Sequence, residues 1–345
     1  MPLPGLTSRR THWQLRHILG SRCCLLVGRK RKQASEYLIH GSGNPGRIYD
    51  QQYGFVNLDP QRFQCASCRM YNEVFLNGES GAHNLYICSH DTHVQLWAAE
   101  CNVWHGRATP RGQDHERAGE LARAWADPSI DAVISLGGGW GSARVLEAGF
   151  QFPRRPKWSL GFSDSCSLLL AQWAAGLPGA IHGSTNGPED QWQRIVDLLK
   201  GRPVAALDGH GIVQGIAEGP LVVTNLTVGT HSIGTPWMPH LDGSILVLED
   251  VGEAPYRVDR MLTQWRSAGL LDKVAGVACG RFSWMEDDIR PGDFSMEEVL
   301  ENRLGKLGVP LVMHLPIGHG LPNQALPLGQ RARLDGRSGR LALLP

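Results

Sequence analysis

The chain lacks both a strong net charge and a long hydrophobic run. Its 345 residues contain 34 Lys and Arg against 33 Asp and Glu, for a formal net charge of +1. This balance gives no electrostatic reason to expect nucleic acid or an anionic membrane as a partner. The longest apolar candidate, residues 168–175, is interrupted by Gln172 and falls well short of the roughly 20 residues that a membrane-spanning helix requires. We therefore expect a globular chain with neither partner.

A recognisable secretory signal is also missing. The apolar stretch at residues 23–27 is shorter than a secretory hydrophobic region, and Lys30, Arg31 and Lys32 follow it closely. We therefore expect a cytoplasmic location.

Cysteine is scarce after residue 101, where only Cys166 and Cys279 remain of eight. These two stand alone and are typical of buried thiols. In the first 101 residues, one group has spacing that resembles a zinc site: Cys65, Cys68, Cys88, His90 and His93. Because the spacing of its later members is irregular, we favour an incidental cluster and predict no metal and no organic cofactor.

Residues 106–183 alternate between short apolar strands and amphipathic helices. The pattern predicts helices at 114–125, 143–149 and 167–175, and strands at 132–136 and 157–162. Such alternation is typical of a parallel sheet covered by helices. We therefore predict an α/β fold whose parallel-sheet domain, residues 106–183, carries a nucleophile elbow.

Residues 191–345 have a different pattern and predict a smaller mixed α/β domain. Strands are expected at 204–207, 211–217, 221–226, 244–248, 274–278 and 310–313, with helices at 256–268 and 296–307. The polar stretch 183–190 is a candidate linker. Residues 1–105 fit neither pattern, and we expect an atypical N-terminal region that is disordered or not native-like, for instance through a misassigned start.

A glycine-rich turn is the strongest chemical feature. The predicted strand 132–136 runs through Gly137-Gly-Gly-Trp-Gly-Ser142 into a helix. A sharp strand-to-helix turn presents a serine hydroxyl clear of its neighbours. Backbone N–H groups at Gly138, Gly139 and Ala143 would then face a tetrahedral oxyanion. A phosphate-binding loop, or a plain turn with Ser142 as helix cap, is the alternative interpretation.

A serine nucleophile needs a base and an orienting carboxylate. His319 lies in the loop Leu315-Pro-Ile-Gly-His-Gly320, and Glu249 and Asp250 follow the strand predicted at 244–248. Each could equally be an ordinary polar loop residue or a solvated charge.

Ordered blocks from Asp114 onward resemble the LD-carboxypeptidase family, which includes the microcin C immunity peptidases. The matching blocks, within about residues 106–345, include Asp114-His-Glu-Arg-Ala118, Gly138-Gly-Trp-Gly-Ser142, Gly161-Phe-Ser-Asp164, Ile181-His-Gly183, Asn225-Leu226, Leu248-Glu-Asp-Val251 and Pro316-Ile-Gly-His319. The chain departs from the family pattern at Gly137, where an arginine is usual, and at Val223-Thr224, where two glycines are usual. The family's N-terminal Ala-Pro-Ser signature is not visible before residue 106.

This resemblance implies a serine hydrolase with the triad Ser142, Glu249 and His319. It implies cleavage of an amide between an L-centre and a terminal D-amino acid, with D-Ala released from a cytoplasmic murein tetrapeptide during peptidoglycan recycling. Asn225, Trp237 and Asp164 are expected to bind this small peptide, and a homodimer is expected. Two alternatives stay open: an immunity-type peptidase acting on an aminoacyl-nucleotide, with Trp237 stacking on the base, and a catalytically impaired binding homologue.

Overall fold

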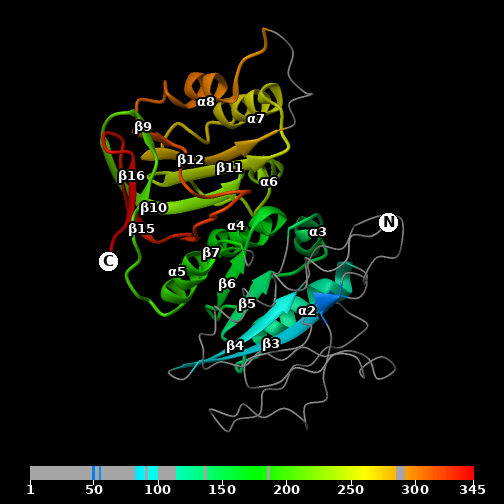
Figure 1. The fold of residues 1–345 in the computed structure, drawn as a ribbon. Coiled ribbons are helices and arrows are strands. Elements are labelled where there is room, and N and C mark those ends of the chain that lie inside the picture. The colour runs from blue at the N-terminus through cyan, green and yellow to red at the C-terminus, as the bar shows by residue number, and fades with distance from the viewer. Residues whose placement is uncertain are drawn as a thin grey trace, which may run out of the picture.

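The computed structural model describes residues 49–50, 54–55, 82–89, 92–99, 114–135, 138–184, 187–284 and 292–345, the first four ranges by their backbone alone. Two sheets dominate this part of the chain (Figure 1). The short strands β1 (Tyr49–Asp50) and β2 (Gly54–Phe55) form a separate antiparallel pair.

The first sheet has six strands within the described residues, in the order β14-β7-β6-β5-β4-β3. Strands β4 to β7 run parallel, and β3 and β14 lie antiparallel at the two edges. The strands are β3 (Ala82–Ser89), β4 (Thr92–Ala99), β5 (Ala132–Ser135), β6 (Trp158–Gly161), β7 (Ala180–His182) and β14 (Leu326–Pro327).

Helices accompany this sheet because each has an apolar face. Helix α2 (Asp114–Ala126) buries Ala118, Leu121 and Trp125 at helical spacing and has acidic residues in its first turn, where the helix dipole favours them. The indole of Trp125 packs edge-on against Phe150 and Phe152. The other helices are α3 (Ser142–Glu147), α4 (Cys166–Ala174), which follows the 3₁₀ turn η4 (Ser163–Ser165), and α5 (Glu189–Leu199).

The second sheet has eight strands in the described residues, in the order β8-β16-β15-β10-β11-β12-β13-β9, with β10 to β13 parallel. Its strands are β8 (Leu207–Asp208), β9 (His210–Val213), β10 (Ile216–Asn225), β11 (Ile245–Val251), β12 (Gly276–Ser283), β13 (Leu311–Met313), β15 (Arg331–Asp335) and β16 (Arg340–Leu343). Its helices are α6 (Leu226–Ser232), α7 (Pro255–Ser267) and α8 (Met296–Leu304).

The two sheets share a hydrophobic core across helix α4. Leu169 and Leu170 of α4 pack in the same cluster as the buried residues of β10 and β11. Strand β14, late in the chain, also pairs with β7 of the first sheet. Figure 1 shows α4 between the two sheets. The carboxyl ends of β6 and β11 are thereby held close together, and loops after parallel strands are where such folds place functional residues.

The predicted α/β class with a parallel sheet and a mixed second sheet is confirmed, and the second sheet has more strands than the first. Most expected elements are present within a few residues of their predicted bounds. Strands β3 and β4 lie within residues 1–105, where the sequence analysis identified no strand, and β4 pairs with the predicted strand β5. The domain boundaries stay predictions, although α5 already begins inside the candidate linker.

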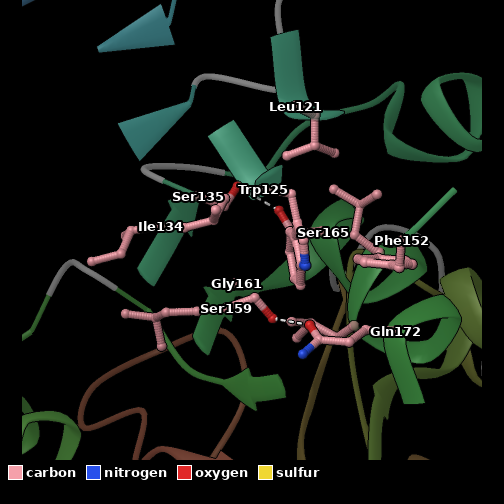
Figure 2. A pocket seen from close by; sticks show the side chains of 13 residues that line it. Leu121, Trp125, Ile134, Ser135, Phe152, Ser159, Gly161, Ser165 and Gln172 are labelled. Carbon is pink, nitrogen blue, oxygen red and sulfur yellow. Dashed lines mark hydrogen bonds between the residues drawn. The ribbon is translucent and has the colours of Figure 1, made fainter. Parts of the chain in front are cut away.

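A small, mostly apolar pocket lies between the first sheet and helices α2 and α4 (Figure 2). Its few polar side chains bond one another: Ser135 to Ser165, and Ser159 to Gln172. The pocket is therefore a gap in the packing of the sheet against its helices. Within the described ranges no helix is long and apolar enough to cross a membrane.

Candidate active site

Glu249 and His319 form a hydrogen-bonded pair at the junction of the two sheets. Glu249 lies near the end of β11 and is fully buried, and His319 lies in the loop after β13. The Glu249 Oε2 lies 2.8 Å from His319 Nδ1 and also accepts the backbone N–H of His319 at 3.1 Å. These two contacts fix both the imidazole and its loop. The structure thus brings together two of the three residues predicted to form a triad.

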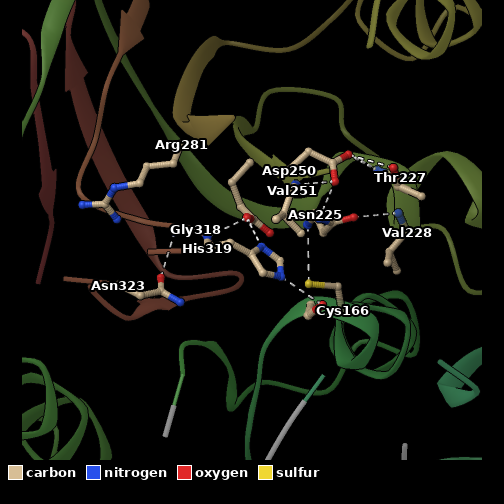
Figure 3. Close-up of polar contacts among 12 residues, drawn as sticks. Cys166, Asn225, Thr227, Val228, Asp250, Val251, Arg281, Gly318, His319 and Asn323 are labelled. Atoms are coloured by element: carbon tan, nitrogen blue, oxygen red, sulfur yellow. Dashed lines mark hydrogen bonds and ion pairs between the residues drawn. The ribbon is translucent and has the colours of Figure 1, made fainter. Parts of the chain in front are cut away.

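The opposite ring nitrogen of His319 faces Ser163. Its Nε2 lies 3.2 Å from the Ser163 Oγ. Figure 3 shows the His319 imidazole among the polar contacts at this junction. With Nδ1 protonated toward Glu249, Nε2 is free to accept a proton. The phenyl ring of Phe162 packs against the His319 imidazole, with ring centroids 4.3 Å apart. The described residues therefore contain a Ser–His–Glu chain, and its serine is Ser163.

Ser163 occupies a strained turn between strand β6 and helix α4. Its φ is +61°, in the left-handed region that few non-glycine residues adopt. Strain of this kind concentrates at functional sites, and a serine at a tight strand-to-helix turn presents its hydroxyl outward. The local backbone therefore has the form of a nucleophile elbow.

Ser142, the predicted nucleophile, does not occupy this position. It is the first residue of α3 and fully buried, and its Oγ has no hydrogen-bond partner within the described residues. Its backbone N–H donates to Asp164 Oδ2 at 2.8 Å. The hydroxyl within hydrogen-bond distance of His319 belongs to Ser163, and the choice of Ser142 as nucleophile stays a prediction. Like the glycine-rich turn, Gly161-Phe-Ser-Asp164 joins a strand to a helix.

The glycine-rich turn forms a wall beside Ser163. A Cβ atom added at Gly138 would lie 2.5 Å from the Ser163 Cβ and 2.7 Å from its Oγ, so only glycine permits this approach. Gly139 and Gly141 both have positive φ, as the tight path of the turn requires. Of the predicted oxyanion residues, Gly138 thus touches the serine, whereas Ala143 is an exposed residue of α3 beside the buried Ser142.

The side chains predicted to bind substrate make hydrogen bonds or packing contacts within the protein. Asn225 caps α6 by accepting from the Val228 N–H, and its amide donates to Asp250 at 2.9 Å. Asp164 holds the N-terminus of α3 through Ser142. Trp237 is half-buried against the cluster formed by helices α2, α3 and α4. These contacts hold the three side chains in place, and their expected roles in substrate binding stay predictions.

Electrostatics keep Glu249 ionised. Burial alone would raise the pKa of this carboxyl, but the imidazoles of His182 and His319 outweigh burial and hold its pKa well below the ordinary value. The neighbouring Asp250 behaves oppositely, since burial raises its pKa despite hydrogen bonds from Thr227 and Asn225. An ionised Glu249 can fix the His319 tautomer and stabilise the imidazolium that forms when His319 accepts a proton.

The described residues contain no group of three His, Cys, Asp or Glu side chains suited to hold a metal. The zinc-like group is only partly covered: Cys65, Cys68 and His90 lie outside the described residues, and Cys88 and His93 are cross-strand partners known by backbone alone.

Cys166 and Cys279 are free and buried, and burial raises the pKa of both thiols, that of Cys279 to about 12. They match the expectation of buried thiols.

Two regions of the chain match models of known protein domains. Residues 81–183 match the LD-carboxypeptidase N-terminal domain, and residues 218–334 match the LD-carboxypeptidase C-terminal domain. The first match begins before residue 106, where the resemblance was expected to start, and it includes β3 and β4. A Synechocystis sp. protein, provisionally named a carboxypeptidase, is 45% identical over 240 residues, which cover 68% of this chain and 79% of the relative.

Two solved structures place the chain among similar folds. Muramoyltetrapeptide carboxypeptidase from Oxalobacter formigenes matches with a TM-score of 0.60 and 30% identity, covering 70% of this chain and 87% of that protein. The wild-type microcin C7 self-immunity protein MccF matches with a TM-score of 0.58 and 20% identity, covering 70% and 83%, which shows a shared fold. The two domain matches in order, together with the 45% identical relative, show that the chain belongs to the LD-carboxypeptidase family.

Proposed function

We propose that this protein is a serine-type LD-carboxypeptidase in which Ser163 is the nucleophile, His319 the general base and Glu249 the orienting carboxylate. The observation that supports this most directly is the continuous contact from Glu249 Oε2 through His319 to the Ser163 Oγ. The arrangement matches the roles of a serine–histidine–carboxylate triad, which is recognised by geometry rather than by chain order.

The proposed reaction begins with proton transfer from the Ser163 Oγ to His319 Nε2 as the oxygen attacks the scissile carbonyl. Glu249 stabilises the resulting imidazolium. His319 then gives the proton to the departing amine, which leaves an acyl group on Ser163. Water enters with His319 again acting as base and releases the shortened peptide. Every proton is returned, and these steps use only the side chains described.

The oxyanion of the tetrahedral intermediate needs N–H donors beside Ser163. We assign these to the glycine turn at Gly138 and Gly139 and to the backbone of Asp164, the residue after the nucleophile at the start of a helical turn. Asp164 also links the Ser163 turn to the start of helix α3, because its Oδ2 accepts the backbone N–H of Ser142. The prediction for Ala143 depended on Ser142 as nucleophile and is not retained.

The proposed substrate is a murein tetrapeptide that loses its terminal D-Ala, as part of cytoplasmic peptidoglycan recycling. Support comes from the name of the 30% identical O. formigenes structure, muramoyltetrapeptide carboxypeptidase. The aminoacyl-nucleotide alternative relies on Trp237 as a base-stacking residue, and we give it second place because Trp237 packs half-buried against the core. A complete Ser–His–Glu chain favours an enzyme over a non-catalytic homologue. A homodimer stays a prediction.

The test incubates the protein with purified murein tetrapeptide and measures the release of D-Ala by mass spectrometry. We expect release by the wild-type protein and a loss of about 10⁴-fold or more in kcat for Ser163→Ala. Ser142→Ala, a matched removal of one hydroxyl in the same region, should keep most of the activity. Release that survives Ser163→Ala would refute the mechanism, and the absence of release by the folded wild type would refute the proposed substrate.

A further inference from the structure

A second histidine faces the same carboxylate from the other sheet. His182 is the last residue of β7, fully buried, and paired in register with Gly161 of β6 and Leu326 of β14. Neither of its ring nitrogens has a hydrogen-bond partner within the described residues. A buried imidazole without partners loses hydrogen bonds that it had in water, and an apolar ring would fill the space without that cost.

The unpartnered nitrogens of His182 lie near an unpartnered oxygen. Glu249 gives its Oε2 to His319, but its Oε1 is buried and has no hydrogen bond within the described residues. His182 Nε2 lies 3.9 Å from this Oε1, about 1 Å beyond hydrogen-bond distance. The ring of Phe162 contacts both imidazoles, edge-on to His182 at 5.5 Å and tilted against His319 at 4.3 Å. The carboxylate of Glu249 is thus bracketed by two histidines.

The chemistry of His182 and Glu249 determines which of the two must carry the proton between them. A carboxylate oxygen offers only lone pairs, so a nitrogen that interacts favourably with it must carry a proton. The other groups near Glu249 are the Cys166 thiol on α4, Asp250 beside it on β11, and His319. Cys166 accepts the Asn225 backbone N–H and is itself only a weak S–H donor, and Asp250 is a second acid. Of these titratable groups, His182 is therefore the one suited to donate toward Oε1, from which its Nε2 lies 3.9 Å away.

We propose that His182 is a positioning residue of the active site, whose Nε2–H faces Glu249 Oε1 and holds the carboxylate in the rotamer that lets Oε2 orient His319. His182 acts through Glu249 and does not touch the substrate. The ends of β7 and β11 thereby cooperate, so that the first sheet supplies Ser163 and the support for Glu249, and the second supplies Glu249 and His319. This assignment rests on the proposed function for its consequence in catalysis, but the contact itself is independent of turnover.

Two substitutions separate this role from simple packing. In His182→Gln the side-chain amide nitrogen takes roughly the place of Nε2, whereas in His182→Asn the shorter amide matches Nδ1 and cannot reach Oε1. Both variants place a neutral amide in the same buried site. We expect His182→Asn to lose about 10-fold or more in kcat with KM within about 2-fold of wild type. The acid limb of its kcat/KM profile should move, and His182→Gln should recover most of both properties.

Magnetic resonance of histidine-labelled wild-type protein supplies a readout that needs no hydrolysis. We expect ¹⁵N shifts that identify His182 Nε2 as protonated and Nδ1 as unprotonated. We also expect a low-field proton at His319 Nδ1 that changes in His182→Asn and not in His182→Gln. These measurements hold even if the wild type releases no D-Ala, an outcome that would refute the proposed function alone.

The proposal is overturned if His182 carries its proton on Nδ1 only. It is equally overturned if His182→Asn matches the wild type in kcat, in pH profile and in the His319 resonance, or if His182→Gln loses as much as His182→Asn. Should neither variant fold, the wild-type ¹⁵N tautomer decides the question.

Discussion

Ser163 and His319 are 156 positions apart in the chain, and yet the Ser163 Oγ lies 3.2 Å from the His319 Nε2. The first residue follows strand β6 of one sheet, and the second lies in a loop after β13 of the other. The contact therefore exists only when the two sheets are packed together. The site is a product of the junction between them, and its function should be sensitive to changes on either side.

Gly138→Ala should damage catalysis without unfolding the protein. The new methyl group would lie 2.5 Å from the Ser163 Cβ, so either the glycine turn or the nucleophile must move. A displacement of about 1 Å at a reacting group costs on the order of 100-fold in rate, which is the loss in kcat/KM we expect. Steady-state kinetics and circular dichroism together provide the check.

Gly119→Ala is the matched control for that substitution. Gly119 lies inside α2, and a Cβ atom there would meet only Arg123 at an ordinary 3.5 Å. Alanine should raise the free energy of unfolding by about 0.5–1 kcal/mol and leave kcat/KM unchanged. Equal kinetic losses in the two variants would contradict the close approach of the glycine turn to Ser163.

Glu249→Gln should lower kcat by about 10³- to 10⁴-fold, because the amide can donate to His319 and favour the wrong tautomer. KM should change far less, since Glu249 is buried behind the histidine and does not contact the substrate. The split between kcat and KM in D-Ala release measures this. A variant that raises KM alone would show that Glu249 serves binding instead.

The lowered pKa of Glu249 predicts how the free energy of unfolding depends on pH. The folded-state pKa of Glu249 lies below its ordinary value of 4.5, so the unfolded chain binds more protons than the folded one in that range. Its contribution to stability is therefore complete above about pH 4.5 and is lost as the pH falls toward the folded-state pKa. Urea unfolding of wild type and Glu249→Gln should show a difference that shrinks on acidification. A difference that grows at low pH would contradict the assignment.

Asn225→Ala should destabilise the protein. The side chain caps α6 and pairs with the buried Asp250, so its loss should cost about 0.5–2 kcal/mol for the cap, with a further cost for the uncovered carboxylate. Ser295→Ala removes the capping side chain of α8 and is a suitable comparison. That control should lose a similar cap energy with kcat/KM unchanged. If Asn225→Ala raises KM with no loss of stability, the residue binds substrate as the sequence analysis expected.

The sequence predicts the α/β class because the central elements are strongly periodic. Helix α2 has its apolar residues at helical spacing, and β5 and β11 are short and continuously apolar. Strand β4, Thr92–Ala99, was missed because polar residues interrupt its sequence, THVQLWAA, whereas parallel strands buried on both faces are usually continuous in hydrophobicity. Strands β7 and β14 are too short, at three and two residues, to give any periodic signal.

The site was predicted only in part for a related reason. Glu249 and His319 each follow a recognisable strand, so their partnership could be inferred from type and position. The sequence analysis placed the nucleophile at Ser142 because the glycine run before it is the more conspicuous turn, whereas we propose Ser163. What distinguishes Ser163 is a positive φ and a contact across 156 residues, and neither is visible in a local pattern. In the structure, Gly138 of that run is the glycine whose lack of a side chain lets the turn approach Ser163.

Labelling with a serine-directed active-site probe tests the central claim most directly. The purified protein is treated with the probe, digested, and mapped by tandem mass spectrometry, with heat-unfolded protein as the control. We expect one adduct on Ser163, absent after unfolding and absent in Glu249→Gln and His319→Ala treated for the same time. An adduct on Ser142 with Ser163 unmodified would contradict that claim.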